Sequence, residues 1–382
     1  MQKLYWRPQT VSIKALILVA LFAAVGAVVV EKVKTTNKQS FYDEKIQASQ
    51  LAISAMESLR AARVLAGYEI DTAVDPAKSG LIGLPMSSVT SVSGILEAKQ
   101  TSINPNFAAV VVDFLKRANI QEGDTVAVGC SGSFPALNVC VYAALETLKL
   151  KPIIISSASA SQWGANIPDL LWIDMERILY EESKFSFRSV AASMGGFEDS
   201  GIGLTSIGKA DINRGIERNG LTMLDSNKDF TEKVDERYEI FKSNAKGAPI
   251  KAYINIGGGT ISNGRKLGKN LFNPGLNNRA PLGVAKVDGL MSRFITEGVP
   301  VIHLVEINKL AEKYELPLSP TMTPAIGQSS VFAKTGYSRW LAATVLVTIL
   351  LALFGFIRSD IGFRLFQSGG PKKGDSHPEP MI

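Results

Sequence analysis

The chain has 382 residues, of which 46% are apolar and 20% are charged. This composition is typical of a globular protein with a bias toward membrane segments, and the length allows two modest domains or one larger domain with appendages. The formal net charge is +6, and residues 1–31 and 339–382 each contribute about +2 of it. Because this charge gathers at the two ends, we expect basic membrane flanks and no nucleic-acid partner.

Two apolar segments bracket the chain and are expected to cross a lipid bilayer. The first, residues 11–31, contains a run of 16 uncharged residues, and the second, residues 339–357, contains a run of 18. Both approach the roughly 20 residues that span a membrane. The alternative for the first is a cleaved signal peptide, although its apolar core exceeds the usual length. The alternative for the second is a buried core helix, which its terminal position disfavours.

The ends outside these segments, residues 1–10 and 358–382, are basic, and the second has the composition of a disordered tail. Seven basic residues lie on the side of the termini and five flank the spans on the side of the middle segment. The positive-inside rule then favours, by a small margin, a cell-membrane protein with cytoplasmic termini and an extracytoplasmic central domain.

Residues 32–338 between the spans are predicted to form an α/β domain. Residues 32–124 form a helical entry region, with apolar positions at helical spacing over 43–67 and 105–119. Residues 125–335 form the sheet core, where short β-branched runs alternate with helical segments. This alternation predicts a mostly parallel sheet with helices on both faces. The expected strands are Val126–Val128, Ile153–Ile155, Tyr253–Ile256 and Val299–His303.

Small and polar residues follow each expected strand. Gly129–Ser133 (GCSGS) follows the first strand, the serine-rich segment Ser156–Gly164 follows the second, Gly257–Gly264 follows the third, and the fourth ends at His303. Ligands of open parallel sheets bind outside the carboxyl ends of the strands. We therefore expect glycines, hydroxyls, a thiol and an imidazole to line one edge of the sheet.

The two cysteines, Cys130 and Cys140, are expected to remain free of one another. Ten residues of continuous helix separate two positions by about 15 Å, whereas a disulfide needs Cα atoms within about 7 Å.

The chain resembles the poly-γ-glutamate system protein family, found beside the polyglutamate synthase and export machinery of some bacteria. The resemblance covers most of residues 10–335. It rests on the segments AKQTSINPNFAAVVVDFLKRANIQEGDTVAVGCSGSFPALN, GGFEDSGIGL, NIGGGTISNG and FITEGVPVIHLVEINKLAEKYELPLSP, with Asp75-Pro76 and Gly80–Gly83. It implies membrane association and a role in making, exporting or trimming an anionic γ-linked glutamate polymer, with that polymer or its synthase and export complex as partner. It implies no particular reaction.

An anion-binding edge is the first interpretation of the loops. Glycines let backbone N–H groups approach an anion, and a helix expected to start near Phe134 adds partial positive charge. The predicted ligand-binding residues are Gly129, Gly132, Ser133, Ser157, Ser159, Gly257, Gly258, Gly259, Thr260 and Arg265. A structural alternative for each glycine is a tight turn. The segment IGGGT is similar to the phosphate loop of sugar-kinase-like ATPases, so a nucleotide-binding domain is a further alternative, and no cofactor is assigned.

A γ-glutamyl hydrolase or transferase is the enzymatic alternative. The turn at Gly129–Ser133 matches the nucleophile elbow Gly-x-Ser-x-Gly except at its last position, which makes Ser131 the candidate nucleophile. Cys130 is the other candidate, as a thiolate at a helix N-terminus. His303 is the candidate base, because the other histidine lies in the tail. The candidate acids are Asp199, Glu198 and Glu306.

The structural alternatives are a turn serine at Ser131 and a structural histidine at His303. Acidic side chains suit Mg²⁺ or Ca²⁺, but no His/Cys spacing indicates zinc, and we predict no metal site. The acidic residues considered as ligands are Asp71, Asp75, Glu198 and Asp199.

Overall fold

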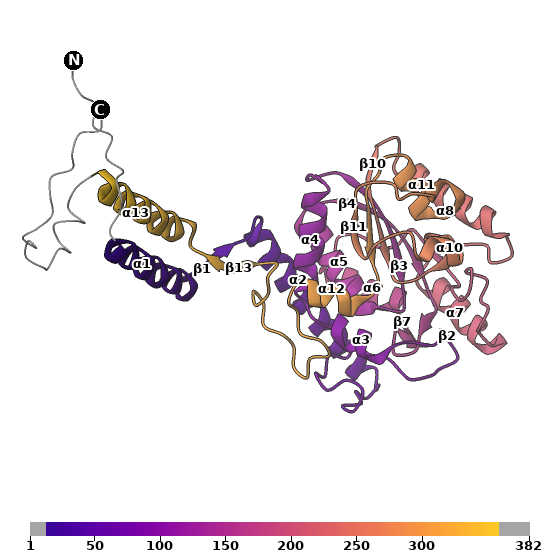
Figure 1. Ribbon diagram of the computed structural model, residues 1–382. Coiled ribbons are helices and arrows are strands. Elements are labelled where there is room, and N and C mark those ends of the chain that lie inside the picture. Colours follow the sequence, from indigo (N-terminus) through magenta and orange to yellow (C-terminus); the bar gives the residue numbers. More distant parts are fainter. Residues whose placement is uncertain (1–12, 359–382) are drawn as a thin grey trace, which may run out of the picture. The chain divides into compact units, whose positions relative to one another are not determined.

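The computed structural model describes residues 13–358 of the chain (Figure 1). Lys38–Ala333 forms one compact unit, and the segments on either side of it form a second. The flank predicted for residues 1–10 and nearly all of the tail predicted for residues 358–382 lie outside the described residues.

The larger unit is built on a seven-stranded sheet with the order β11-β12-β10-β3-β4-β8-β9. Neighbouring strands run parallel, except that β11 at the edge is antiparallel to β12. The prediction of an α/β fold with a mostly parallel sheet is therefore confirmed. The strands are β3 (Thr125–Ser131), β4 (Lys151–Ser157), β8 (Ala191–Ser193), β9 (Thr222–Met223), β10 (Ile250–Ile256), β11 (Gly275–Asn277) and β12 (Val301–Leu304).

The order of the strands reverses between β3 and β10. The chain leaves β3 and builds β4, β8 and β9 outward on one side, then returns to place β10 and β12 on the other. The two strands are direct neighbours, with Ala127 opposite Tyr253 and Gly129 opposite Asn255. Connections leave such a switch point in opposite directions, which opens a crevice at the carboxyl ends of the strands.

Helices cover both faces of the sheet, as predicted (Figure 1). Alternate residues of β3 enter different cores, with Val126 and Val128 on one face and Ala127 on the other. The first core contains residues of α2 (Tyr42–Leu65), α4 (Phe107–Arg117), α5 (Pro135–Thr147) and α6 (Trp172–Glu181). The second contains residues of α8 (Phe230–Asn244) and α11 (Leu290–Thr296).

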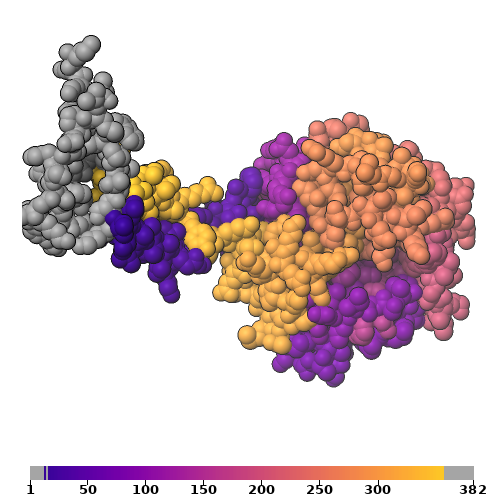
Figure 2. All heavy atoms as spheres, viewed as in Figure 1, coloured from indigo at the N-terminus to yellow at the C-terminus, as the bar shows by residue number. Residues whose placement is uncertain are grey.

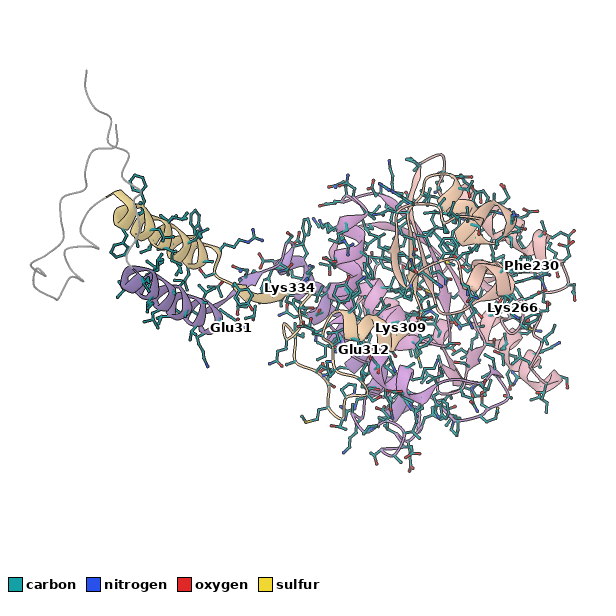
Figure 3. The ribbon with its side chains drawn as sticks, in the orientation of Figure 1. Glu31, Phe230, Lys266, Lys309, Glu312 and Lys334 are labelled. Atoms are coloured by element: carbon teal, nitrogen blue, oxygen red, sulfur yellow. The ribbon has the colours of Figure 1, made fainter. Side chains whose placement is uncertain are left out.

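Shorter elements complete this unit. They are β2 (Thr90–Val92), α3 (Leu96–Ser102), β5 (Ala160–Ser161), β6 (Asn166–Ile167), β7 (Leu170–Leu171), α7 (Ser206–Arg218), α9 (Thr260–Asn263), α10 (Arg265–Lys269), η1 (Val284–Lys286) and α12 (Ile307–Lys313). Lys309 and Glu312, labelled in Figure 3, lie on the exposed side of α12. Figure 2 shows the golden C-terminal part of this unit beside the purple segment that contains α3, and Ser319 N donates to Thr101 Oγ1 over 3.1 Å.

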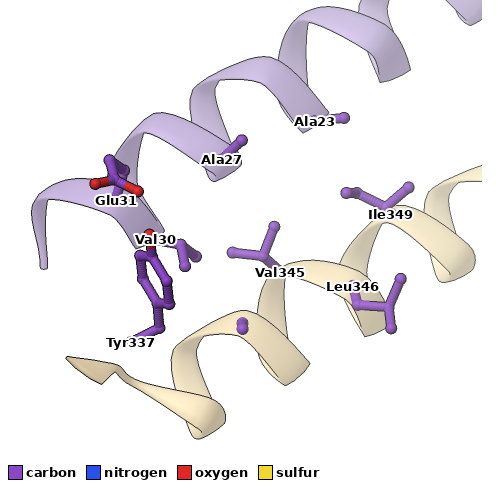
Figure 4. Close-up of a pocket in the computed structure, with 9 residues that line it drawn as sticks. Ala23, Ala27, Val30, Glu31, Tyr337, Val345, Leu346 and Ile349 are labelled. Carbon is purple, nitrogen blue, oxygen red and sulfur yellow. The ribbon is translucent and has the colours of Figure 1, made fainter. Parts of the chain in front are cut away.

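The smaller unit consists of α1 (Ile13–Lys32), β1 (Lys34–Lys38), β13 (Ala333–Tyr337) and α13 (Arg339–Arg358), with β1 paired to β13. Helices α1 and α13 pack closely at Gly26, where an added Cβ would lie 2.5 Å from Val345 Cγ1. Figure 4 shows a shallow apolar groove between them, lined by alanines and branched aliphatic side chains, with Tyr337 pointing toward Glu31.

One helix in the described part of the chain is long and apolar enough to cross a membrane. It is Arg339–Phe356 in α13, with a mean hydropathy of 2.0, and none of it is buried. The first of the two spans predicted from the sequence coincides with α1, and its crossing of a bilayer remains a prediction, as does the orientation of the chain.

Candidate functional site

A cavity of about 640 Å³ lies at the carboxyl ends of the parallel strands. The loops after β3, β4, β8, β10 and β12 line it, together with the segment of β2 and α3. Hydroxyl groups dominate its polar lining, and they belong to Ser91, Ser93, Ser131, Ser133, Ser156, Ser157, Ser159, Ser161, Ser193, Thr260 and Ser262. The edge expected from the sequence thus exists as one concave, hydroxyl-rich space at the topological switch point.

Most residues predicted for the site line this cavity. They are Gly129, Cys130, Ser131, Ser133, Ser157, Ser159, Asp199, Gly257, Gly258, Gly259, Thr260 and His303. Gly258 and Gly259 face open space, since an added Cβ would meet nothing within 4 Å. Their role in binding remains a prediction.

Two predicted ligand-binding residues, Gly132 and Arg265, lie outside the cavity lining, and their role in binding stays a prediction. Gly132 packs beneath the cavity, where an added Cβ would lie 2.8 Å from the carbonyl oxygen of Ser159. Arg265 pairs with Glu198, with 2.6 Å between Nε and Oε1, and its guanidinium lies over the ring of Phe230, 4.2 Å from the centroid. Figure 3 shows Phe230 near Lys266, the neighbour of Arg265. Arg265 therefore ties the loop containing Glu198 to α10.

The turn after β3 is a hydrogen-bonded connection, and Ser131 lacks the conformation of a nucleophile elbow. Ser131 Oγ accepts a hydrogen bond from Ser133 N over 3.2 Å, and Gly132 N donates to the carbonyl of Ser157 over 3.2 Å. Neither Ser131 nor Ser133 has a positive φ, whereas an elbow is a strained turn. The short side-chain contact is typical of a serine that stabilises its own turn.

Cys130 is a buried, protonated thiol. Its Sγ lies 3.7 Å from the hydroxyl of Tyr142, which donates to the carboxylate of Glu176 over 2.5 Å. Burial raises the pKa of Cys130 well above its ordinary value. The expected thiolate at a helix N-terminus is therefore wrong, because the sulfur points into a low-dielectric core that disfavours the charged form.

His303 lies near the end of β12, as predicted, but its hydrogen bond is the reverse of the one that the histidine of a Ser–His–Asp triad makes. Asn255 Nδ2 donates to the carbonyl of Gly257 over 2.7 Å, which identifies the amide nitrogen, and to His303 Nδ1 over 3.0 Å. Nδ1 is thus the acceptor and the proton lies on Nε2. In a Ser–His–Asp triad the histidine carries its proton on Nδ1 and uses a free Nε2 as the base. Burial also lowers the pKa of His303 to about 4, so the ring is neutral.

The carboxylates predicted as triad acids form ion pairs with other residues. Asp199 Oδ2 lies 2.5 Å from Nη2 of Arg237, Glu198 pairs with Arg265, and Glu306 pairs with Lys309 over 2.5 Å. Glu198 and Asp199 both have positive φ, at 51° and 53°, so these two ion pairs fasten a strained turn. The structure therefore assembles no Ser–His–acid triad from the predicted residues.

Two of the carboxylates considered as metal ligands accept hydrogen bonds within turns. Asp75 is buried and accepts hydrogen bonds from Ser79 N, Ser79 Oγ and Gly80 N at 2.8 to 3.0 Å. Asp71 Oδ1 accepts from Ala73 N over 2.9 Å. Within residues 13–358, no group of three or more His, Cys, Asp or Glu side chains is arranged to hold a metal ion.

Lys99 is the principal cavity residue that sequence reasoning missed. It lies on α3, is 3% exposed, and its Nζ lies 2.8 Å from Ser161 Oγ, contacts the carbonyl of Ser133, and sits 3.7 Å from the ring centroid of Phe134. Burial lowers its pKa to about 7. Buried lysines are usually paired with carboxylates, yet none pairs with Lys99 in the described part of the chain. No spacing marks this lysine, because α3 is a short helix whose packing is set by distant segments.

The charged side chains of the cavity lining that have no partner of opposite charge are cationic. Arg237 is neutralised by Asp199, whereas Lys99 and Lys269 have no acidic partner among the described residues. Hydroxyl groups line the same cavity, and one of them, Ser161 Oγ, accepts a hydrogen bond from Lys99 Nζ. Such a lining suits a carboxylate or phosphate, which accepts hydrogen bonds from hydroxyls and pairs with ammonium groups.

Comparison with protein-family models, with curated proteins and with solved structures finds no match for this chain.

Proposed function

We propose that this protein is a membrane-anchored accessory component of poly-γ-glutamate synthesis or export, and that its α/β unit binds the anionic polymer or a precursor in the cavity. The observation that carries the binding function is the buried amino group of Lys99, which has hydroxyl and carbonyl partners and, within residues 13–358, no carboxylate partner. A site of this kind places a cation where an anionic ligand supplies the missing charge. The resemblance described above supplies the identity of the polymer.

The proposal includes two membrane spans. Helix α13 meets the length and hydropathy of a span, and α1 packs against it with its apolar side chains largely exposed. A bilayer covers such side chains, so both helices are proposed to cross it, with the α/β unit on the extracytoplasmic side.

Binding is tested with the full chain in detergent micelles, by calorimetric titration with poly-γ-glutamate. We expect Lys99→Met to weaken binding at least tenfold, because a lost charge-assisted contact costs about 1.5–3 kcal/mol. Lys149→Met is the matched control, since the Lys149 side chain is 71% exposed. Equal affinity in Lys99→Met, or no binding by the parent chain, contradicts the proposal. Titration with Mg·ATP tests the nucleotide alternative, and dextran is the uncharged polymer control.

The pH dependence of binding follows from the same lysine. Its pKa of about 7 means that the ammonium form, which attracts an anion, predominates below neutral pH. We therefore expect stronger binding at pH 6 than at pH 8.5. Lys99→Met should lose most of this dependence.

Orientation is tested by cysteine labelling, since both native cysteines are buried. Lys149→Cys introduces an exposed thiol, and a membrane-impermeant maleimide should modify it in intact cells. Modification only after the cells are broken would contradict an extracytoplasmic α/β unit.

A further inference from the structure

We propose that Ser161 and Lys99 form an acyl-transfer site in the cavity, in which Ser161 Oγ attacks the amide carbonyl of a carboxylate-bearing ligand. The ligand class rests on the proposed function. This pair differs from the nucleophile and base expected from the sequence. The structure does not assemble a triad from those expected residues.

The two side chains have the contact that a nucleophile and its base require. Lys99 Nζ lies 2.8 Å from Ser161 Oγ, within hydrogen-bond reach. A neutral lysine amine has two N–H groups and one lone pair. In the structure, Nζ donates to the carbonyl of Ser133 and to Ser161 Oγ. When Nζ loses the proton that it directs at Ser161, a lone pair takes its place and can accept the Ser161 hydroxyl proton. The other contact of Ser161 Oγ, to the carbonyl of Gln162, is much longer at 3.5 Å.

The surroundings of Lys99 make a neutral amine available at neutral pH beside the ammonium form that attracts an anion. Its helix contributes Glu97, which is exposed. The cavity lining contributes Asp199, which pairs with Arg237, and Glu306, which pairs with Lys309. None of these three carboxylates forms an ion pair with Lys99. Burial therefore acts unopposed by a carboxylate, and its effect on the pKa, a fall to about 7, makes the neutral form abundant at neutral pH.

Three segments distant in sequence hold this pair. Ser161 belongs to β5, which pairs with β2, and its backbone N–H donates to Ser133 Oγ over 3.0 Å. Ser133 belongs to the turn after β3, and its carbonyl accepts from Lys99. The ring of Phe134 covers the amine at 3.7 Å. Both functional groups are thus positioned by the fold, and both residues line the cavity.

The reaction balances without a cofactor. Ser161 Oγ forms a bond to the acyl carbon, and its proton passes to Lys99 Nζ. The C–N bond breaks, and the leaving amine takes that proton. Water then attacks the resulting ester, gives its proton to Lys99, and releases the carboxylic acid as the proton returns to Ser161 Oγ. An acceptor amine in place of water gives transfer instead of hydrolysis.

The first test is covalent labelling of the full chain in detergent with an alkyl fluorophosphonate, followed by mass spectrometry of peptides. We expect one phosphonate adduct, on Ser161, with a labelling rate that rises through a pH near 7. Ser161→Ala should remove it, and Lys99→Met should slow labelling by about 10²-fold or more, the contribution of a general base. Ser243→Ala is the matched control, because Ser243 is exposed and lies outside the cavity.

The second test is release of p-nitroaniline from γ-L-glutamyl-p-nitroanilide, with poly-γ-glutamate binding measured on the same samples. We expect slow release by the parent chain and none by Ser161→Ala. No adduct on Ser161, an adduct on another serine, or labelling unaffected by Lys99→Met overturns the acyl-transfer site. If polymer binding persists in that case, the proposed binding function stands, whereas loss of binding by the parent chain contradicts that function separately.

Discussion

Replacing Lys99 by methionine should stabilise the protein at low pH, because the folded state holds this lysine at a cost. Its pKa falls from an ordinary 10.5 to about 7. At about 1.36 kcal/mol for each pKa unit, the charged form is disfavoured by up to about 5 kcal/mol relative to the unfolded chain. Methionine keeps an apolar stem and loses two hydrogen bonds, worth roughly 1 kcal/mol each. We therefore expect Lys99→Met to be more stable by about 3 kcal/mol at pH 6.

The sign of the pH dependence follows from proton binding. Between pH 7 and pH 10.5 the unfolded chain binds a proton at Lys99 that the folded protein lacks, so the parent chain gains stability as the pH rises. The advantage of Lys99→Met should therefore disappear near about pH 9. Above that pH the two curves of stability should cross, and the variant should become less stable than the parent chain by up to about 2 kcal/mol, the two lost hydrogen bonds.

The assay is urea unfolding of the full chain in detergent at pH 6, 8 and 10, followed by tryptophan fluorescence. Trp172 is fully buried in the α/β unit and reports its unfolding. Lys149→Met is the control and should change the free energy of unfolding by less than about 0.5 kcal/mol at each pH. A Lys99→Met variant that is less stable at pH 6, or a difference independent of pH, would refute the reasoning and indicate that the lysine is hydrated or paired.

Three further predictions concern the same unit. Burial lowers the pKa of His303 to about 4, so the folded protein disfavours the protonated ring. The free energy of unfolding should therefore decrease by up to about 3 kcal/mol as the pH falls from about 6.5 toward 4. His303→Asn should remove this decrease, as measured by urea unfolding at pH 4.5 and pH 7. Cys130 and Cys140 should be unreactive toward Ellman's reagent in the native protein and should both react in urea, since both are buried; reaction of a native thiol would contradict this environment. Gly195→Ala should destabilise by roughly 1–3 kcal/mol more than Gly247→Ala, because both have positive φ but only the first Cβ would meet a serine hydroxyl, 2.1 Å away; equal effects would point to backbone strain alone.

The sequence was sufficient for the longer elements of the α/β unit. The helix expected over residues 43–67 is α2 (Tyr42–Leu65), and three of the four expected strands lie in β3, β4 and β10. The fourth, Val299–His303, overlaps β12, which begins two residues later at Val301. Strands β8, β9 and β11 were not expected. They have two or three residues each, which is too short for a periodic pattern, and only pairing with a neighbouring strand defines them.

The sequence alone therefore determined the class of fold and the edge of the sheet at which polar groups gather, because both follow from local patterns of apolar runs and the small residues after them. The tertiary structure decided which side chains work together. It turned Cys130 into the core, joined His303 to Asn255, and brought Lys99 on α3 against Ser161, 62 residues away. Burial and hydrogen-bond direction depend on contacts between distant segments, and these contacts set the protonation of each group.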